Sequence, residues 1–260
     1  MNKNTLYITF DGLSDPLGQS QILPYLVGIA KNGYCITIIS CEKQSRLTHE
    51  KNNIETLLSQ NNISWKYIIY NETGNALSRF KYIQQVKAIA KDIVKQNKIC
   101  LIHCRSYLAA LIGLDFKRKF KIPFLFDMRG FWADERIDGG IWKKNNLIHN
   151  IFYKYFKRKE KSFIQDADAI VSLTQNGANY LAKVFGDNLV NTKTTIIPCC
   201  TNTNLFNVGS INSDFILPEF SSTDELIIYS GSVGTWYYTR EMMDCVFEWN
   251  KTNKNIKLLI

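Results

Sequence analysis

The stretch KICLIHCRSYLAALIGLDFKRKFKIPFLFDMRG, residues 98–130, contains two short apolar runs separated by a segment with helical periodicity. The apolar runs at residues 100–104 and 123–127 predict β-strands, and the segment at residues 106–120 predicts a helix between them. Because two parallel strands need a long crossover connection, this order predicts a parallel β-α-β unit. The stretch therefore places the chain in the α/β class.

The same alternation extends in both directions along the chain. It predicts further strands at residues 6–10, 34–40, 65–70, 169–173 and 194–198, and further helices at residues 20–32, 45–61, 79–97, 144–165 and 175–185. Seven strands with six crossovers predict a doubly wound parallel sheet. In such sheets ligands bind at the carboxyl ends of the strands, so we expect functional residues in the loops that follow them.

The regular pattern stops after residue 198. Residues 199–222 are rich in Asn, Ser and Thr, which is typical of a linker. A strand at 226–230, a helix at 239–250 and a strand at 256–260 follow. One β-α-β unit cannot cover both faces of its own sheet. We therefore expect residues 1–198 to form one domain and residues 223–260 to be the truncated start of a second.

Composition narrows the class of protein. The chain has 260 residues, of which 45% are hydrophobic, and it holds seven cysteines without a CxxC pair. This pattern favours reduced thiols over disulfides or a metal site, and no metal or other cofactor is expected. No apolar run approaches the roughly 20 residues of a membrane-spanning helix, and the N-terminus lacks the features of a signal peptide. We expect a cytoplasmic location.

The net charge of +9 is unevenly distributed. Four basic residues face seven acidic ones after residue 208, so the first 208 residues carry a net charge of +12. A basic domain of this kind favours an anionic partner, such as a nucleotide, a phosphorylated lipid, a membrane surface or nucleic acid. A solvated basic surface without a partner is the alternative.

The first predicted strand is followed by the loop DGLSDPLGQSQ, residues 11–21. Gly18 would let a ligand approach the backbone, and the free N–H groups at the start of the next helix, near Gln19 and Ser20, favour an anionic group. Ser20 is expected to cap that helix. The alternative is an ordinary loop before a capped helix.

The segment FDMRGFWADERIDGGIW, residues 126–142, is the densest polar cluster, and we expect a glycine-loosened loop there. Arg129 can form a bidentate contact with a phosphate or carboxylate, and Trp132 can stack on a sugar or hold the loop to the domain. The carboxylates, which include Asp134, Glu135 and Asp138, can bind hydroxyl groups or act as a base. The alternative is a loop held by internal ion pairs.

Residues at the ends of two further predicted strands are expected to line the same ligand site. The segment HCRSY, residues 103–107, places Arg105 and Ser106 toward the same crevice, and Thr174 follows the sixth strand. His103 lies on the strand itself, where a histidine is more often a hydrogen-bonded core residue than a catalyst.

The predicted helix at residues 147–164 combines aromatic side chains with Lys154, Lys157, Arg158, Lys159 and Lys161. Basic residues beside aromatic ones, here Tyr153 and Phe156, suit the surface of an anionic membrane. An ordinary crossover helix with a solvated basic face explains the pattern equally well.

Five segments in order resemble the N-terminal, acceptor-side half of family-four glycosyltransferases of the GT-B type, especially those of capsule and exopolysaccharide synthesis. They are LSDPLGQSQILPYL, FDMRGFWADERIDGG, Glu160 followed by DADAIVSLT, IPCCTNTNLF and YSGSVGTWYY. The resemblance implies two Rossmann-like domains, the second only begun within this chain. It also implies retaining transfer of a sugar, without a metal, from a nucleotide-sugar donor to a saccharide or lipid-linked acceptor in surface polysaccharide synthesis.

The resemblance also implies roles for individual residues. Arg129 and Glu135 would be catalytic; the acceptor would be bound by Arg105, Ser106, Trp132, Asp134 and Asp138; the donor phosphates would be bound by Gly18, Gln19, Ser20, Thr174 and Ser232. A lipid-linked acceptor would bring the domain to the inner face of the membrane, where contact with anionic lipid is expected.

Three features depart from the family pattern. The turn GSVGTWYY has no Arg or Lys before Arg240, and Cys199, Cys200, Thr201 and Asn202 stand where the family has Asn-Gly-Val-Asp. The family's signature of two glutamates separated by seven residues would lie beyond residue 260. We therefore expect residues 1–260 alone to be inactive.

Two other classes fit the same pattern. A nucleotide-sugar epimerase would share the architecture, but the lone histidine on a strand and the polysaccharide-type loops argue against it. A non-enzymatic module that binds an anionic membrane or nucleic acid would use the basic residues. No nucleic-acid-binding motif is present, so a nucleic-acid partner is not expected.

Overall fold

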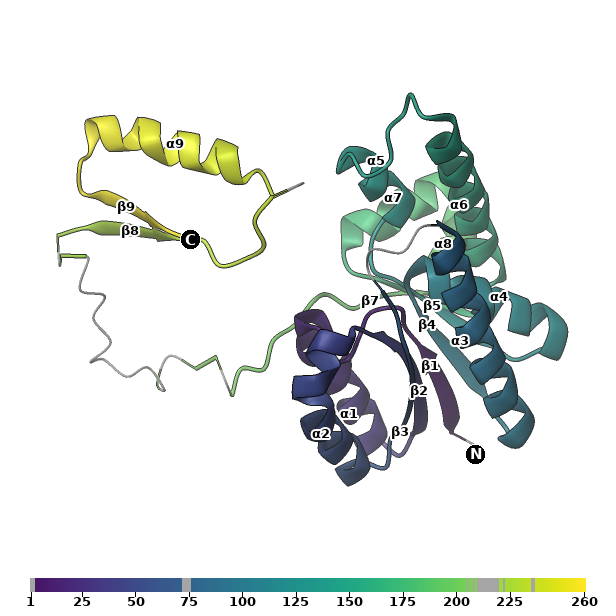
Figure 1. Ribbon diagram of the computed structural model, residues 1–260. Coiled ribbons are helices and arrows are strands. Elements are labelled where there is room, and N and C mark those ends of the chain that lie inside the picture. The colour runs from purple at the N-terminus through teal and green to yellow at the C-terminus, as the bar shows by residue number, and fades with distance from the viewer. Residues whose placement is uncertain are drawn as a thin grey trace. The chain divides into compact units, whose positions relative to one another are not determined.

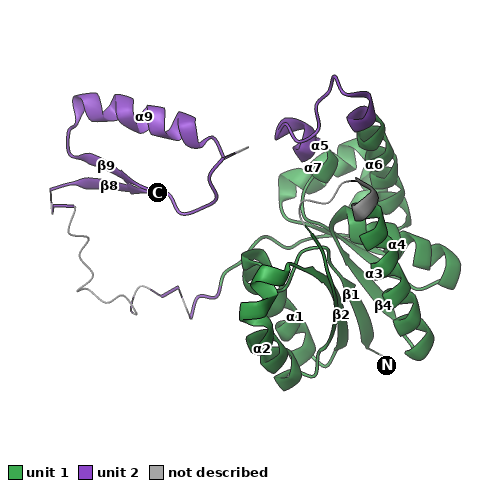
Figure 2. Ribbon diagram, in the orientation of Figure 1, with its two compact units in different colours: residues 1–133, 151–201 green, residues 134–150, 202–260 purple. Residues whose placement is uncertain are grey.

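A computed structural model describes residues 3–71, 76–204, 206–207, 209, 220–221, 223–234 and 237–260 (Figure 1). The chain divides into two compact units (Figure 2). Unit 1 comprises residues 1–133 and 151–201, and unit 2 comprises residues 134–150 and 202–260. Within the described residues, no helix combines the length and the apolar character needed to cross a membrane.

Unit 1 contains a seven-stranded parallel sheet with the strand order β3-β2-β1-β4-β5-β6-β7. Its strands are β1 (Asn4–Ile8), β2 (Cys35–Glu42), β3 (Ser64–Ile69), β4 (Leu101–Arg105), β5 (Phe124–Met128), β6 (Ala169–Ser172) and β7 (Thr194–Ile196). The order reverses between β1 and β4, which makes that position the topological switch point of the sheet. The predicted doubly wound parallel sheet is confirmed.

Helices connect the strands and cover the sheet on both faces. They are the π-helix η1 (Gly18–Ile22) and the α-helices α1 (Leu23–Lys31), α2 (Gln44–Gln60), α3 (Ala76–Gln96), α4 (Ser106–Phe120), α5 (Trp132–Asp138), α6 (Leu147–Asp166), α7 (Gln175–Phe185) and α8 (Asp187–Asn191). Figure 1 shows α1 and α2 on one face of the sheet and α3 and α4 on the other. Helices on both faces explain why the inner strands carry apolar side chains on both of their faces.

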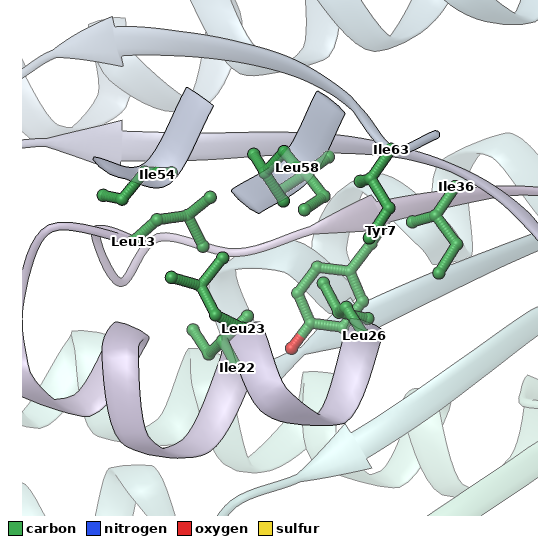
Figure 3. Close-up of a cluster of buried hydrophobic side chains, with 10 residues drawn as sticks. Tyr7, Leu13, Ile22, Leu23, Leu26, Ile36, Ile54, Leu58 and Ile63 are labelled. Carbon is green, nitrogen blue, oxygen red and sulfur yellow. The ribbon is translucent and has the colours of Figure 1, made fainter. Parts of the chain in front are cut away.

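One part of the core lies between the sheet and the helices α1 and α2 (Figure 3). Tyr7 of β1 and Ile36 of β2 supply its sheet side, and Leu26 and Leu58 reach it from the two helices. Burial of each such side chain contributes about 1.5–3 kcal/mol to stability. This packing holds α1 and α2 against the sheet.

The predicted elements lie within a few residues of those observed, with two local differences. Residues 132–138 form the helix α5 where a loop was expected. Ala133, Glu135 and Arg136 favour a helix, and the carboxylates of Asp134 and Glu135 lie in its first turn, where the helix dipole stabilises them. Residues 187–191 form a further short helix, α8, for which no element was predicted.

The expected cap at Ser20 is wrong. The chain enters η1 at Gly18, and α1 then begins at Leu23 with no side-chain cap. Ser20 Oγ donates instead to the carbonyl of Pro16 at 2.8 Å. Residues 16–17 are already helical before η1 begins at Gly18, so Ser20 lies inside the coiled segment and not at its N-terminal cap. Gly18 is buried there, close to the backbone of Gly12 and Leu13.

Unit 2 contains a β-α-β unit formed by β8 (Glu225–Ile228), α9 (Thr239–Thr252) and β9 (Ile256–Leu259). The two strands pair in parallel, from Glu225 opposite Ile256 to Ile228 opposite Leu259. These are the strand, helix and strand that the sequence predicts. Much of the predicted linker at residues 199–222, together with Thr235 and Trp236 of the turn that follows β8, lies outside the described residues.

We predict that Gly18→Ala lowers the free energy of unfolding by about 3 kcal/mol, because an added Cβ would lie 2.0 Å from the carbonyl oxygen of Gly12. Gly28→Ala is the matched control: its Cβ would meet no atom within 4 Å, and it lies inside α1. It should raise stability by about 0.5–1 kcal/mol. Urea unfolding followed by circular dichroism measures both, and equal effects of the two substitutions would contradict the packing role of Gly18.

Candidate active site

Charged residues gather at the switch point of the sheet because of strand register. His103 and Arg105 alternate along β4 and therefore share one face, and Arg105 lies directly opposite Asp127 of β5. Asp11 follows β1, the other neighbour of β4, and Arg129 follows Asp127 by two residues. We call Asp11, His103, Arg105, Asp127 and Arg129 the switch-point cluster.

Arg105 is the buried centre of this cluster. Its side chain is 2% exposed; its Nε lies 2.9 Å from Asp11 Oδ2 and its Nη1 lies 3.8 Å from Asp127 Oδ2. Burial by itself would lower the pKa of the guanidinium, but Tyr7, Asp11 and Asp127 outweigh it and hold the pKa above its usual value. Arg105 thus ties the ends of β1, β4 and β5 together as a permanent cation.

Asp127 is the buried anion of the cluster, with a side chain that is 6% exposed. Burial by itself would raise its pKa, but His103, Arg129 and Arg105 together hold the pKa of the carboxyl below its usual value. Asp127 is therefore ionised at neutral pH and can only accept hydrogen bonds.

His103 completes the buried side of the cluster. Its Nε2 lies 3.5 Å from Asp127 Oδ2, and its ring packs on Tyr7 with centroids 4.6 Å apart and edge-on to Tyr25 at 6.0 Å. This environment agrees with the interpretation of His103 as a core histidine that has a polar partner.

Arg129 has weaker partners than Arg105. Its Nη1 lies 3.7 Å from Asp127 Oδ1, and its Nη2 donates to Cys199 Sγ at 3.4 Å, which is a poor acceptor. Its side chain is 19% exposed. The guanidinium is therefore held beside the carboxylate while N–H groups remain available for a ligand.

The loop after β1 is anchored by Glu42, a residue that sequence reasoning did not select. The Glu42 side chain lies at the end of β2 with no exposed surface, and it accepts from the backbone N–H groups of Leu13 and Ser14 at 2.8 and 3.1 Å. The hydroxyl groups of Ser14 and Ser40 also donate to it. The sequence signal that could have identified Glu42 is a carboxylate at the end of an apolar strand.

The residues predicted to bind donor phosphate have local partners. Gly18 is buried by backbone packing, Gln19 Nε2 donates to the Ser14 carbonyl at 3.3 Å, and Ser20 bonds to Pro16. The Thr174 side chain caps α7 by accepting from the Gly177 N–H at 3.0 Å. Their proposed contact with a ligand remains a prediction.

Ser106 follows Arg105 in a strained conformation. Its φ is +65°, in the left-handed region that residues other than glycine and asparagine seldom adopt. Such residues persist where the surrounding structure fixes them, and they cluster at functional sites. The strain places the first turn of α4 immediately beside the cluster.

Trp132 has a packing role. Its ring stacks on Tyr107 with centroids 5.9 Å apart and packs on Phe156 at 4.6 Å. Tyr107 and Lys157 both donate to Glu160, whose side chain is 1% exposed. This cluster holds the start of α5 to unit 1.

The predicted site residues thus divide into two groups. The structure brings Arg105 and Arg129 together around Asp127, with Ser106 adjacent. Asp134, Glu135, Asp138 and Ser232 belong to unit 2. Asp127 belongs to the polar cluster whose carboxylates were predicted to bind hydroxyl groups or act as a base. Asp11 was not assigned a site role from the sequence, although it follows an apolar strand.

We predict that Arg105→Ala mainly lowers the stability of the protein, whereas Arg129→Ala mainly lowers its activity. Arg105→Ala removes the partner of two carboxylates and should cost about 3–5 kcal/mol of stability. Arg129→Ala breaks only long contacts at a partly exposed position, so it should cost less stability than Arg105→Ala, while any transfer activity of the site should fall by orders of magnitude.

Thermal unfolding and transfer rates of the two variants check this pair. If Arg129→Ala unfolds the protein and leaves the activity per folded molecule unchanged, Arg129 is a structural ion-pair partner instead.

The sheet order and the charged cluster at its switch point define an α/β protein of the Rossmann-like class. The chain belongs to Glycosyltransferase Family 4, whose family model matches residues 26–205. No curated protein sequence gives a significant match.

Solved structures with the same fold include several glycosyltransferases. HepE of Anabaena, in complex with UDP and glucose, matches 98% of this chain at 11% identity with a TM-score of 0.57, and the match covers 59% of the HepE chain. Sucrose-phosphate synthase of Thermosynechococcus elongatus matches 99% at 13% identity with a TM-score of 0.57, over 70% of its own chain. UGT89C1 of Arabidopsis thaliana, in complex with UDP-L-rhamnose, matches 100% at 10% identity with a TM-score of 0.55, over 69% of its chain.

Proposed function

We propose that this protein is a glycosyltransferase that moves a sugar from a nucleotide-sugar donor to a saccharide or lipid-linked acceptor in surface polysaccharide synthesis, with retention of the anomeric configuration. The family match over residues 26–205 carries this proposal. The switch-point cluster supports it, because the carboxyl ends of the strands beside the switch point are where doubly wound sheets bind ligands.

In this proposal the chain contributes to catalysis by positioning and charge stabilisation and supplies no covalent nucleophile. Arg129 and Glu135 are the two catalytic residues. Arg129 lies on the acceptor side and binds the acceptor oxygen that reacts. Arg105, Ser106, Trp132, Asp134 and Asp138 line the acceptor side. The backbone and side chains of Gly18, Gln19, Ser20, Thr174 and Ser232 receive the phosphates of the donor.

The same proposal assigns the parts of the chain. Residues 1–198 are the acceptor-binding domain, residues 199–222 the linker, and residues 223–260 belong to the donor-binding domain. The chain spans 59% of the HepE chain.

We predict that the protein transfers a sugar from a nucleotide-sugar donor, and that the transfer proceeds with retention of the anomeric configuration. A panel of donors and saccharide acceptors, followed by NMR of the anomeric proton in the product, measures both. An inverted product would refute the retaining mechanism. Epimerised nucleotide sugar formed without an acceptor would identify an epimerase instead.

We further propose that the protein works at the cytoplasmic face of the membrane through α6. Burial in the structure excludes two of the residues that the sequence suggested for contact with lipid. Phe156 is buried against Trp132, and Lys157 bonds to buried Glu160, so neither is available to lipid. Ile151, Phe152 and Tyr155 are exposed instead. Three exposed basic residues lie on the same helix, namely Lys154, Arg158 and Lys161.

We predict that replacing Lys154, Arg158 and Lys161 by Glu weakens binding to anionic vesicles about a hundredfold, since each basic residue contributes about 1 kcal/mol near such a surface. Replacing the exposed Lys91, Lys95 and Lys183 by Glu is the matched control, with the same change in net charge. Vesicle sedimentation at low and high salt measures the binding. Equal losses in the two triple variants would point to net charge alone, and no preference for anionic lipid would rule out the contact.

A further inference from the structure

One oxygen of Asp127 lacks a hydrogen bond. Within the part of the chain that the structure describes, Asp127 Oδ1 is buried and has no hydrogen-bond partner. Its nearest charged neighbour is Arg129 Nη1 at 3.7 Å, which is beyond hydrogen-bond distance. A buried carboxylate oxygen without a donor is unfavourable, so this atom favours a ligand that supplies one.

The other oxygen of the same carboxylate is differently placed. Asp127 Oδ2 faces His103 Nε2 at 3.5 Å and Arg105 Nη1 at 3.8 Å. These two side chains lie on β4, are almost fully buried, and hold the carboxylate from one side. Oδ1 lies on the other side, beside the guanidinium of the partly exposed Arg129.

Asp127 and Arg129 present complementary hydrogen-bonding groups side by side. Asp127 Oδ1 accepts only, and the Arg129 guanidinium donates only, with Cys199 Sγ as a weak partner on Nη2. Two neighbouring hydroxyl groups of a sugar match this pattern, because one can donate to the carboxylate while the oxygen of the other accepts from the guanidinium. A phosphate fits poorly, because it brings negative charge and acceptor oxygens next to Asp127.

We propose that Asp127 and Arg129 form a subsite for a pair of adjacent hydroxyl groups on an uncharged sugar ring, with Asp127 Oδ1 as the acceptor and the Arg129 guanidinium as the donor. This subsite rests on the proposed function and makes it more specific. It assigns the ring of the acceptor sugar, and not a phosphate of either substrate, to the carboxyl end of β5. Asp127 thereby joins Arg129 as a specificity-determining residue.

The test uses the 260-residue chain with D-glucose, D-galactose, D-mannose and N-acetylglucosamine as probes in ligand-detected NMR, and inorganic phosphate in a separate arm. The wild-type chain is expected to bind at least one of these sugars, and phosphate is expected not to displace the bound sugar. Asp127→Asn, which keeps the size of the side chain and removes its charge, should weaken sugar binding about tenfold or more. Asp187→Asn on exposed α8 is the matched control and should have no effect.

Arg129→Met is the second variant, so that the test survives if Asp127→Asn does not fold by circular dichroism. It should also abolish sugar binding, since it removes the donor half of the subsite. Sugar binding with unchanged affinity in either folded variant overturns the proposal, as does the absence of binding by the wild-type chain. Phosphate binding that competes with the sugars also overturns it, and identifies an anion site.

Kinetics of the active protein separate this inference from the proposed function. Asp127→Asn should raise the KM for the acceptor about tenfold and leave the KM for the donor unchanged. A protein that binds sugars through Asp127 but transfers none would refute the proposed function and leave the subsite intact. An active protein whose acceptor KM does not respond to Asp127→Asn would refute the subsite alone.

Discussion

The burial of the Arg105 guanidinium is the constraint on which the rest of the site depends. A buried cation of this kind is tolerated only when carboxylates lie within reach. Here Asp11, after β1, and Asp127, on β5, supply them from the two strands that flank β4. The ion pairs therefore fix three strand ends at the switch point, and they orient Asp127 so that its other oxygen faces away from Arg105.

The loop after β1 follows from the same constraint. The chain turns directly after Asp11, and Glu42 holds that turn by accepting from the N–H groups of Leu13 and Ser14. The helical conformation begins at residues 16–17, and Gly18 packs close to the carbonyl of Gly12, so Ser20 lies inside the coiled segment. One edge of the site is thus held by buried backbone contacts, which resist change more strongly than surface side chains do.

Sequence periodicity predicted the sheet and the helices α1–α4, α6, α7 and α9, because apolar strands alternate with segments of helical period. It also led to Arg105 and Arg129, since both stand at strand ends. It could not reveal that Arg105 is buried and Arg129 only loosely held, because that difference depends on which strand lies between which neighbours. Trp132 shows the same limit: its stacking on Tyr107 depends on the packing of α4 against the segment after β5.

The charges within the site balance one another, whereas the net positive charge of the chain lies outside the site. Two guanidinium groups and two carboxylates make the switch-point cluster neutral when His103 is neutral, so the charge of +12 in the first 208 residues lies elsewhere. Part of it is paired, since Lys117 and Arg118 bond to Asp168 and Asp166 on the surface. The remaining surface charge would favour an anionic partner over a distance, while the proposed subsite in the neutral cluster would recognise hydroxyl groups at contact. A basic domain can therefore carry a sugar-binding subsite that has no affinity of its own for phosphate.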